Sequence, residues 1–176
     1  MATQPRAGEM LVGAYLKLVE ACEIVAYGQH SPIAGDQMEI DVIGIHPGRQ
    51  EIITCEVATH LRGLGYGNAE TNRDKVESKF QNAERYVDRA FGDAESHRFE
   101  FWSPKVPTAS ETKLHAVAEA FEDRTETELA LVINGRYTDR IDQLRRAAGD
   151  TCAQRNELAF RLLQILEHLE PAAAEP

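Results

Sequence analysis

The chain has 176 residues, of which 43% are hydrophobic and 27% are charged. This excludes the class of disordered chains, which are poor in apolar residues, and the length suits one domain better than two. The formal net charge of −10 also argues against strong, non-specific binding of nucleic acid, because basic surfaces attract that polyanion.

We therefore expect a single domain over residues 1–170 and a disordered tail over residues 171–176. The stretch Met1–Glu9 has no apolar run resembling a signal peptide, and no segment approaches the length that crosses a bilayer. These features predict a cytoplasmic protein without a membrane partner. The three cysteines are widely spaced and have no close Cys or His neighbours, so we expect core residues rather than a disulfide framework or zinc site.

The first third of the chain predicts one helix followed by strands. Apolar residues recur at helical spacing from Glu9 to about Val25, which indicates an amphipathic helix. Ile24–Tyr27 is typical of a short strand, and Gln29–Asp36, with its proline and glycine, of a loop. Two strands then follow, Met38–Ile45 and Glu51–Thr59, joined by a tight turn at His46-Pro47-Gly48-Arg49.

The middle of the chain begins with the glycine-rich segment Leu61–Gly67, which predicts a mobile loop. It lacks the Gly-Lys-Ser/Thr ending of a phosphate-binding P-loop. We expect a helix from Thr71 to about Phe91, opened by a capping box of Thr71 with Asp74. A strand over Arg98–Trp102 follows.

The last third predicts three helices and one strand. A helix from Thr108 to about Phe121, capped by Thr108 with Glu111, leads to the apolar strand Leu129–Ile133, which suits burial on both faces. Two helices complete the chain, about Thr138–Ala148 and Cys152–Leu169, the second capped by Thr151 with Gln154. The predicted order is α-β-β-β-α-β-α-β-α-α.

The last helix carries a wide apolar band. Packing within the monomer is the simpler interpretation, but the band could also meet a second subunit, so a homodimer or larger complex stays open.

Two acidic residues among β-branched neighbours, Asp41 and Glu56, are the strongest functional signal. If the hairpin turns at Gly48-Arg49, the antiparallel register places Asp41 opposite Glu56, with Cβ atoms about 5 Å apart. Two ionised carboxylates that close repel each other, and a cation between them would relieve the repulsion. Mg²⁺ (or Mn²⁺) prefers such oxygen ligands, can polarise a phosphodiester and lowers the pKa of an attacking water.

Alternative interpretations remain for these residues. The two carboxylates could lie on an exposed sheet face and in solvent, and a register slip of one residue would separate them. His46 and His60 lie near the acidic segments, but we expect solvent contact or ordinary hydrogen bonds for both rather than a ligand role.

Short motifs between Gly8 and Asn134 resemble the PD-(D/E)XK nuclease superfamily, which has the restriction-endonuclease-like fold. The segments that carry the resemblance are Gly8-Glu9 with Tyr15-Leu16, Glu39-Ile40-Asp41 and Cys55-Glu56-Val57-Ala58. The resemblance implies an α/β fold with a central mixed β-sheet flanked by helices, here with extra C-terminal helices.

The resemblance also implies roles for individual residues. Asp41 and Glu56 would bind the metal, and Glu9 would complete or orient the site. Ala58 departs from the family pattern, because a lysine that helps position the attacking water normally stands there. Lys75 or Lys79, four apart in the following helix, could replace that lysine or could simply be solvated residues at the flank of the helix.

The predicted function is accordingly a metal-dependent nuclease that hydrolyses phosphodiester bonds, with DNA as its partner. The alternative is a catalytically inactive nuclease-like module for binding or assembly, which Ala58 and the acidic balance favour. A small-molecule hydrolase ranks last, because the chain has no nucleophile motif.

Overall fold

The computed structural model describes residues 4–30 and 39–169, and its elements alternate in the predicted order. The elements are α1 (Ala7–Leu18), β1 (Ile24–His30), β2 (Glu39–His46), the 3-10 turn η1 (Pro47–Arg49), β3 (Glu51–Val57), α2 (Ala69–Phe91), β4 (Ser96–Ser103), α3 (Thr108–Thr125), β5 (Leu129–Ile133), α4 (Asn134–Gly149) and α5 (Leu158–Glu167). The predicted tail at 171–176 lies outside the described residues, as does most of the loop predicted over Gln29–Asp36.

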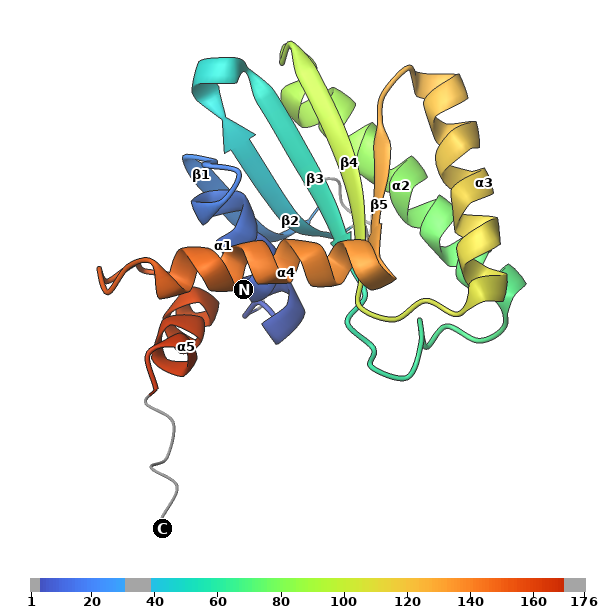
Figure 1. The fold of residues 1–176 in the computed structure, drawn as a ribbon. Helices are drawn as coiled ribbons and strands as arrows, with labels where there is room; N and C mark the ends of the chain where they lie inside the picture. The colour runs from blue at the N-terminus through green and yellow to red at the C-terminus, as the bar shows by residue number, and fades with distance from the viewer. Residues whose placement is uncertain (1–3, 31–38, 170–176) are drawn as a thin grey trace.

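The strands form one sheet in the order β1-β2-β3-β4-β5 (Figure 1). β1, β2 and β3 run antiparallel through successive connections, whereas β3, β4 and β5 are parallel and are connected through α2 and α3. The chain is therefore an α/β protein with a mixed five-stranded sheet, as predicted.

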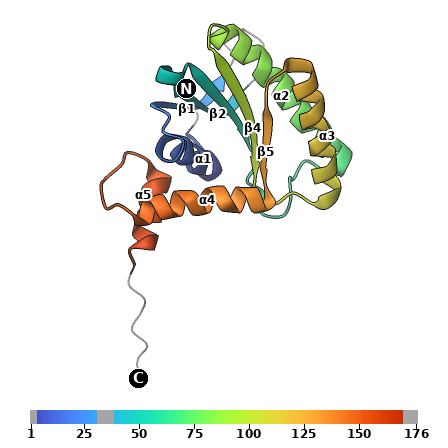
Figure 2. The ribbon, with the colours of Figure 1, turned by 45° about the horizontal axis from the view of Figure 1, so that its top comes forward.

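Helices cover both faces of the sheet (Figure 2). On one face, α2 and α3 pack against the strands through four phenylalanines in edge contact, Phe80, Phe99, Phe101 and Phe121. On the other face, α1, α4 and α5 share a second core, in which Trp102 is fully buried. β5 is buried along its whole length, as its continuous apolar run predicts.

The boundaries of the first two elements differ from prediction. α1 ends at Leu18 rather than near Val25, and the chain then turns through Ala21, which has a left-handed φ of 61°. Apolar residues beyond Leu18 belong instead to the turn and to β1, which extends to His30. A helical spacing of apolar residues does not show where the backbone leaves the helix.

All three predicted capping boxes are wrong. Asn68 caps α2, accepting a hydrogen bond from the Thr71 backbone N–H (2.9 Å), so Thr71 lies inside the helix. α3 begins after Pro107 without a side-chain cap. The helix predicted from Cys152 begins only at Leu158, and the Thr151 hydroxyl instead accepts from the N–H of Ala153.

Two further observations concern expectations from composition. Cys22 and Cys55 are buried as predicted, but Cys152 is exposed. Of the helices in residues 4–30 and 39–169, none combines the length and the apolar character that a membrane-spanning segment needs.

Candidate active site

The hairpin of β2 and β3 brings the two predicted carboxylates to the same end of the sheet. The ladder pairs His46 with Glu51 and ends at Val42 with Cys55, so the next positions along this predicted register are Asp41 and Glu56. Both side chains are nearly excluded from solvent, which contradicts the interpretation that they lie on an exposed face. Asp41 is held by the backbone N–H of Val57, which donates to its Oδ2 at 2.7 Å.

Lys79 of α2 joins these two carboxylates. Its Nζ donates to Oε2 of Glu56 and lies 3.5 Å from Oδ2 of Asp41. Lys75 lies one turn nearer the start of α2, is exposed, and forms no ion pair with the residues that the structure describes. The geometry thus separates the two lysines that the sequence left as alternatives.

Glu9 faces the same site from the first turn of α1. Its Oε2 accepts a hydrogen bond from the backbone N–H of Arg6 at 2.9 Å, which fixes the carboxylate at the helix N-terminus. Gly8 allows this approach, because a Cβ there would lie 2.2 Å from Cγ2 of Thr59. A glycine beside Glu9 therefore lets α1 pack closely on the chain that follows β3.

Glu9, Asp41 and Lys79 line one pocket of about 270 Å³, whereas Glu56 lies outside its lining and contacts Lys79. Its walls are formed by Arg6, Glu9, Asp41, Val57, Ala58, Thr59, His60, Tyr66 and Lys79. Ala58 is buried here and carries no charge, so the cations in the pocket lining are the one-third-exposed Lys79 and the exposed Arg6.

The glycine-rich loop contributes two aromatic rings to this pocket. His60 and Tyr66 meet edge to face, with ring centroids 6.1 Å apart. Gly65 lies between them in sequence with a φ of +76°, and a Cβ at this position would lie 3.1 Å from the His60 ring. Sequence reasoning gave Tyr66 no role, and the glycines around it were the only available signal.

His46 takes no part in the pocket. It is buried at the opposite end of β2, where its Nδ1 lies 3.6 Å from a carboxylate oxygen of Glu23. Arg62, by contrast, is exposed on the glycine-rich loop.

Burial controls the ionisation of the pocket. It raises the pKa of Glu56 to about 8, with the neighbouring Asp41 carboxylate acting in the same direction and Lys79 opposing both. Burial also raises the pKa of Glu9, again reinforced by Asp41 and opposed by the Arg6 N–H.

The pKa of Lys79 responds to two opposing influences. Burial lowers it, but Glu56 and Asp41 outweigh burial, so the pKa is raised. The raised pKa of Lys79 depends on an ionised Glu56, whereas the raised pKa of Glu56 favours its protonated form. We expect Lys79 to keep its proton, because Asp41 also holds it and its side chain is one-third exposed, whereas Glu56 is almost completely buried.

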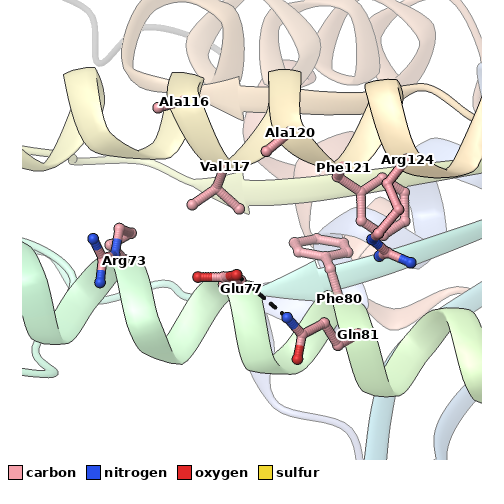
Figure 3. Close-up of a pocket in the computed structure, with 9 residues that line it drawn as sticks. All are labelled: Arg73, Glu77, Phe80, Gln81, Ala116, Val117, Ala120, Phe121 and Arg124. Carbon is pink, nitrogen blue, oxygen red and sulfur yellow. Dashed lines mark hydrogen bonds between the residues drawn. The ribbon is translucent and has the colours of Figure 1, made fainter.

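A larger groove of about 470 Å³ lies between α2 and α3 (Figure 3). Figure 3 shows Phe80 and Phe121 on its floor, with Glu77 accepting a hydrogen bond from Gln81 (3.3 Å) at its side. Glu77 is the only carboxylate in its lining, so size alone does not make this groove the better candidate.

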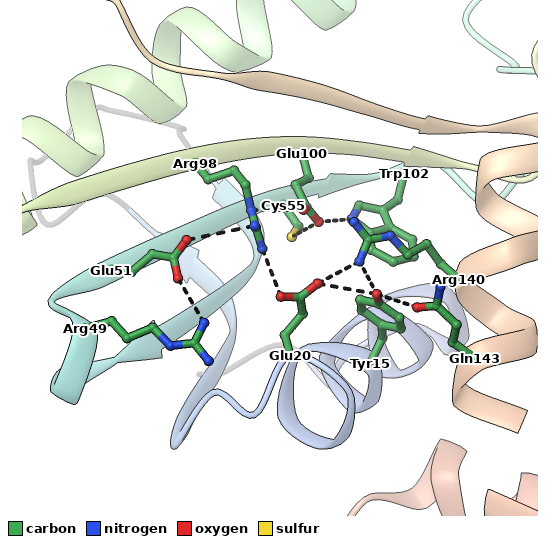
Figure 4. Close-up of polar contacts among 10 residues, drawn as sticks. All are labelled: Tyr15, Glu20, Arg49, Glu51, Cys55, Arg98, Glu100, Trp102, Arg140 and Gln143. Carbon is green, nitrogen blue, oxygen red and sulfur yellow. Dashed lines mark hydrogen bonds and ion pairs between the residues drawn. The ribbon is translucent and has the colours of Figure 1, made fainter. Parts of the chain in front are cut away.

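A second group of buried charges lies on the opposite face of the sheet (Figure 4). Glu100 accepts a hydrogen bond from Nε1 of Trp102 at 2.8 Å and lies 3.2 Å from Nε of Arg98. Arg98 and Arg140 both reach Glu20, at 3.3 and 2.6 Å. Each carboxylate here has a basic partner, and the group ties α1, β4 and α4 together, so we assign it a structural role.

Two searches bear on the identity of the site. Within residues 4–30 and 39–169, no three or more His, Cys, Asp or Glu side chains are grouped so that they could hold a metal ion. Comparisons with protein-family models, curated proteins and solved structures find no match.

Proposed function

We propose that the chain is a metal-dependent nuclease that hydrolyses phosphodiester bonds of DNA, built on a restriction-endonuclease-like fold. The single observation behind this is the contact of Lys79 with both Asp41 and Glu56. The resemblance noted in the sequence requires two acids and a cation together. Ala58 removes the cation from its usual strand position, and a lysine from the next helix reaches the same pair.

The donors in the pocket fit Mg²⁺ or Mn²⁺ in part. Asp41 and Glu56 would supply oxygen ligands, and a bound cation would favour the ionised form of Glu56, which burial disfavours. Two protein carboxylates suffice for Mg²⁺, which keeps several waters and also binds substrate phosphate. When bound, the metal would polarise the phosphodiester and lower the pKa of the attacking water.

The other residues would act on the substrate directly or hold the site. Lys79 would stabilise negative charge that develops on the phosphate oxygens, as a positioned ammonium does in a water-poor pocket. Glu9 would orient the site from α1. The exposed side chain of Arg6 at the rim could pair with a neighbouring phosphate.

A plasmid-nicking assay with Mg²⁺ or Mn²⁺ tests the proposal. We expect nicking by the wild type and none by Asp41→Ala. Lys79→Met should lose at least 100-fold in rate, on the order expected for loss of one charge-stabilising group. Lys75→Met is the matched control on the same helix and should retain the rate. Activity that survives Asp41→Ala would refute the assignment.

A rescue experiment tests whether a lysine at position 58 can replace Lys79. Ala58 lines the pocket beside Glu56, so Ala58→Lys in a Lys79→Ala background moves the cation to the strand. We expect this double variant to recover part of the activity that Lys79→Ala alone loses. Activity that Lys79→Ala retains and Lys75→Ala loses would contradict the role given to Lys79.

The second candidate is an inactive nuclease-like module for binding or assembly. It is favoured by the same contact, because the ammonium group of Lys79 already compensates the acidic pair without a metal. Calorimetry with Mn²⁺ separates the two candidates. Binding that Glu56→Ala removes supports the nuclease, whereas no binding by the wild type supports the module.

A further inference from the structure

α5 carries an exposed apolar stripe. Leu158, Leu162 and Ile165 are 62%, 54% and 48% exposed, and their spacing of four and three residues is that of a coiled-coil seam. Leu169, 63% exposed, continues the stripe just beyond the end of the helix at Glu167. Leu166, 61% exposed, lies beside this stripe. Large aliphatic side chains exposed in this regular pattern indicate a surface that another helix covers.

An apolar groove adjoins the first half of the stripe. It has a volume of about 390 Å³ and lies between α1 and α5. Its walls are formed mainly by Ala7, Met10, Leu11, Leu158, Leu162 and Leu163. The groove therefore continues the stripe from the N-terminal half of α5 onto α1.

The groove and the stripe are complementary in a way that suits two copies of the same surface. The groove accompanies the N-terminal half of α5, and Ile165 and Leu166 in its C-terminal half form a ridge that Leu169 extends beyond the helix. A two-fold axis across the middle of α5 would place each ridge in the groove of the other copy, because a two-fold interface is made from one patch used twice.

The exposed apolar area of the stripe suits a dimer interface. At roughly 100 Å² for a fully exposed side chain, the five, each about half to two-thirds exposed, offer on the order of 300 Å² per chain before the groove walls are added. That is a fitting apolar core for a standard interface of roughly 800 Å² per partner.

We propose that the chain forms a homodimer in which α5 packs antiparallel against α5 of a second copy, with the ridge of each in the α1–α5 groove of the other. A polar pair follows Leu166 in the chain, as at the rim of an interface: Arg145 of α4 donates to Glu167 at 2.7 Å. The proposal is independent of the nuclease function.

Sedimentation velocity of the full chain over a range of concentrations tests the proposal. We expect a species of twice the 19.6 kDa chain mass that dissociates on dilution. The double variant Leu162→Glu/Ile165→Glu should stay monomeric, with an unchanged circular dichroism spectrum. Leu61→Glu, which changes an isolated exposed leucine on the loop, is the matched control and should still dimerise. A monomeric wild type at all concentrations, or a dimer that the double variant retains, would overturn the proposal.

Cysteine cross-linking covers the case in which the glutamate variants fail to fold, and it tests the orientation. In a Cys152→Ser background, which removes the exposed thiol, antiparallel pairing places Leu162 of one copy near Ile165 of the other. An equimolar mixture of Leu162→Cys and Ile165→Cys chains should therefore give a disulfide-linked dimer on mild oxidation. Absence of this product would contradict the antiparallel arrangement.

Discussion

Replacement of Glu56 by glutamine should stabilise the protein at alkaline pH while it removes a metal ligand. The pKa of Glu56 is about 8 in the folded chain, against an ordinary value of 4.5. Between these values the folded state holds a proton that the unfolded state has released, so the free energy of unfolding falls as pH rises. Glutamine keeps the shape of the protonated acid and does not titrate.

The magnitude follows from the span of the shift. Each pH unit inside the window is worth about 1.36 kcal/mol, so from pH 5 to pH 8 the wild type should lose about 4 kcal/mol relative to Glu56→Gln. The loss of the charged contact with Lys79 offsets part of this gain. That offset is small, because Lys79 is partly exposed and still has Asp41 at 3.5 Å.

Urea denaturation in the presence of a chelator, at pH 5 and pH 8, measures the effect. The two proteins should differ most at pH 8, with the variant more stable, and converge towards pH 5. Glu77→Gln, an exposed acid on α2, is the control and should show no pH-dependent difference from the wild type. A wild type that is more stable than Glu56→Gln at pH 8 would show that Glu56 is already ionised and compensated by Lys79, and would refute the reasoning.

Three further outcomes follow from the same geometry. Gly8→Ala places a Cβ against Thr59, so it should lower the free energy of unfolding by about 1–3 kcal/mol and also lower the nicking activity. Gly48→Ala, where a Cβ would have no atom within 4 Å, should change neither quantity. Urea denaturation measures the first effect and the plasmid assay the second. Arg140→Leu removes a charged hydrogen bond to Glu20 and should lower the free energy of unfolding by about 2 kcal/mol, measured by urea titration, without altering Mn²⁺ binding in calorimetry. Mg²⁺ at about 100 times its dissociation constant should add about 2.7 kcal/mol to the wild type, seen as a higher melting temperature that Asp41→Ala does not share.

The sheet could be predicted from sequence because its signals are local. The hairpin has a short turn between two β-branched runs, and the turn fixes the register that brings Asp41 beside Glu56. The continuous apolar run Leu129–Ile133 likewise predicts a strand buried on both faces. The predicted helix caps were wrong because the same pair of residue types also occurs elsewhere: Thr71 lies inside α2, and Thr151 precedes α5 by several residues.

Part of the site could not be reached from sequence, because it depends on how α2 lies across the sheet. Lys75 and Lys79 share one face of the helix, and only the packing of α2 on the sheet decides which of the two lysines contacts Glu56. Arg6 and Tyr66 enter the pocket through the N-terminus of α1 and a loop with left-handed glycines. Neither position follows from a periodic pattern.

The two groups of buried charge on opposite faces of the sheet differ in their balance. Glu100 has Arg98 and the Trp102 N–H as partners, and Arg98 and Arg140 also serve Glu20, which suits a permanent structural network. On the other face, Asp41 and Glu56 share Lys79, whose side chain is one-third exposed, and Glu9 has the exposed Arg6 at 3.9 Å. Burial, reinforced by Asp41 and opposed by Lys79, raises the pKa of Glu56, so the folded chain loses stability as pH rises. The metal of the proposed function would offset this loss, because a bound cation favours the ionised form of Glu56.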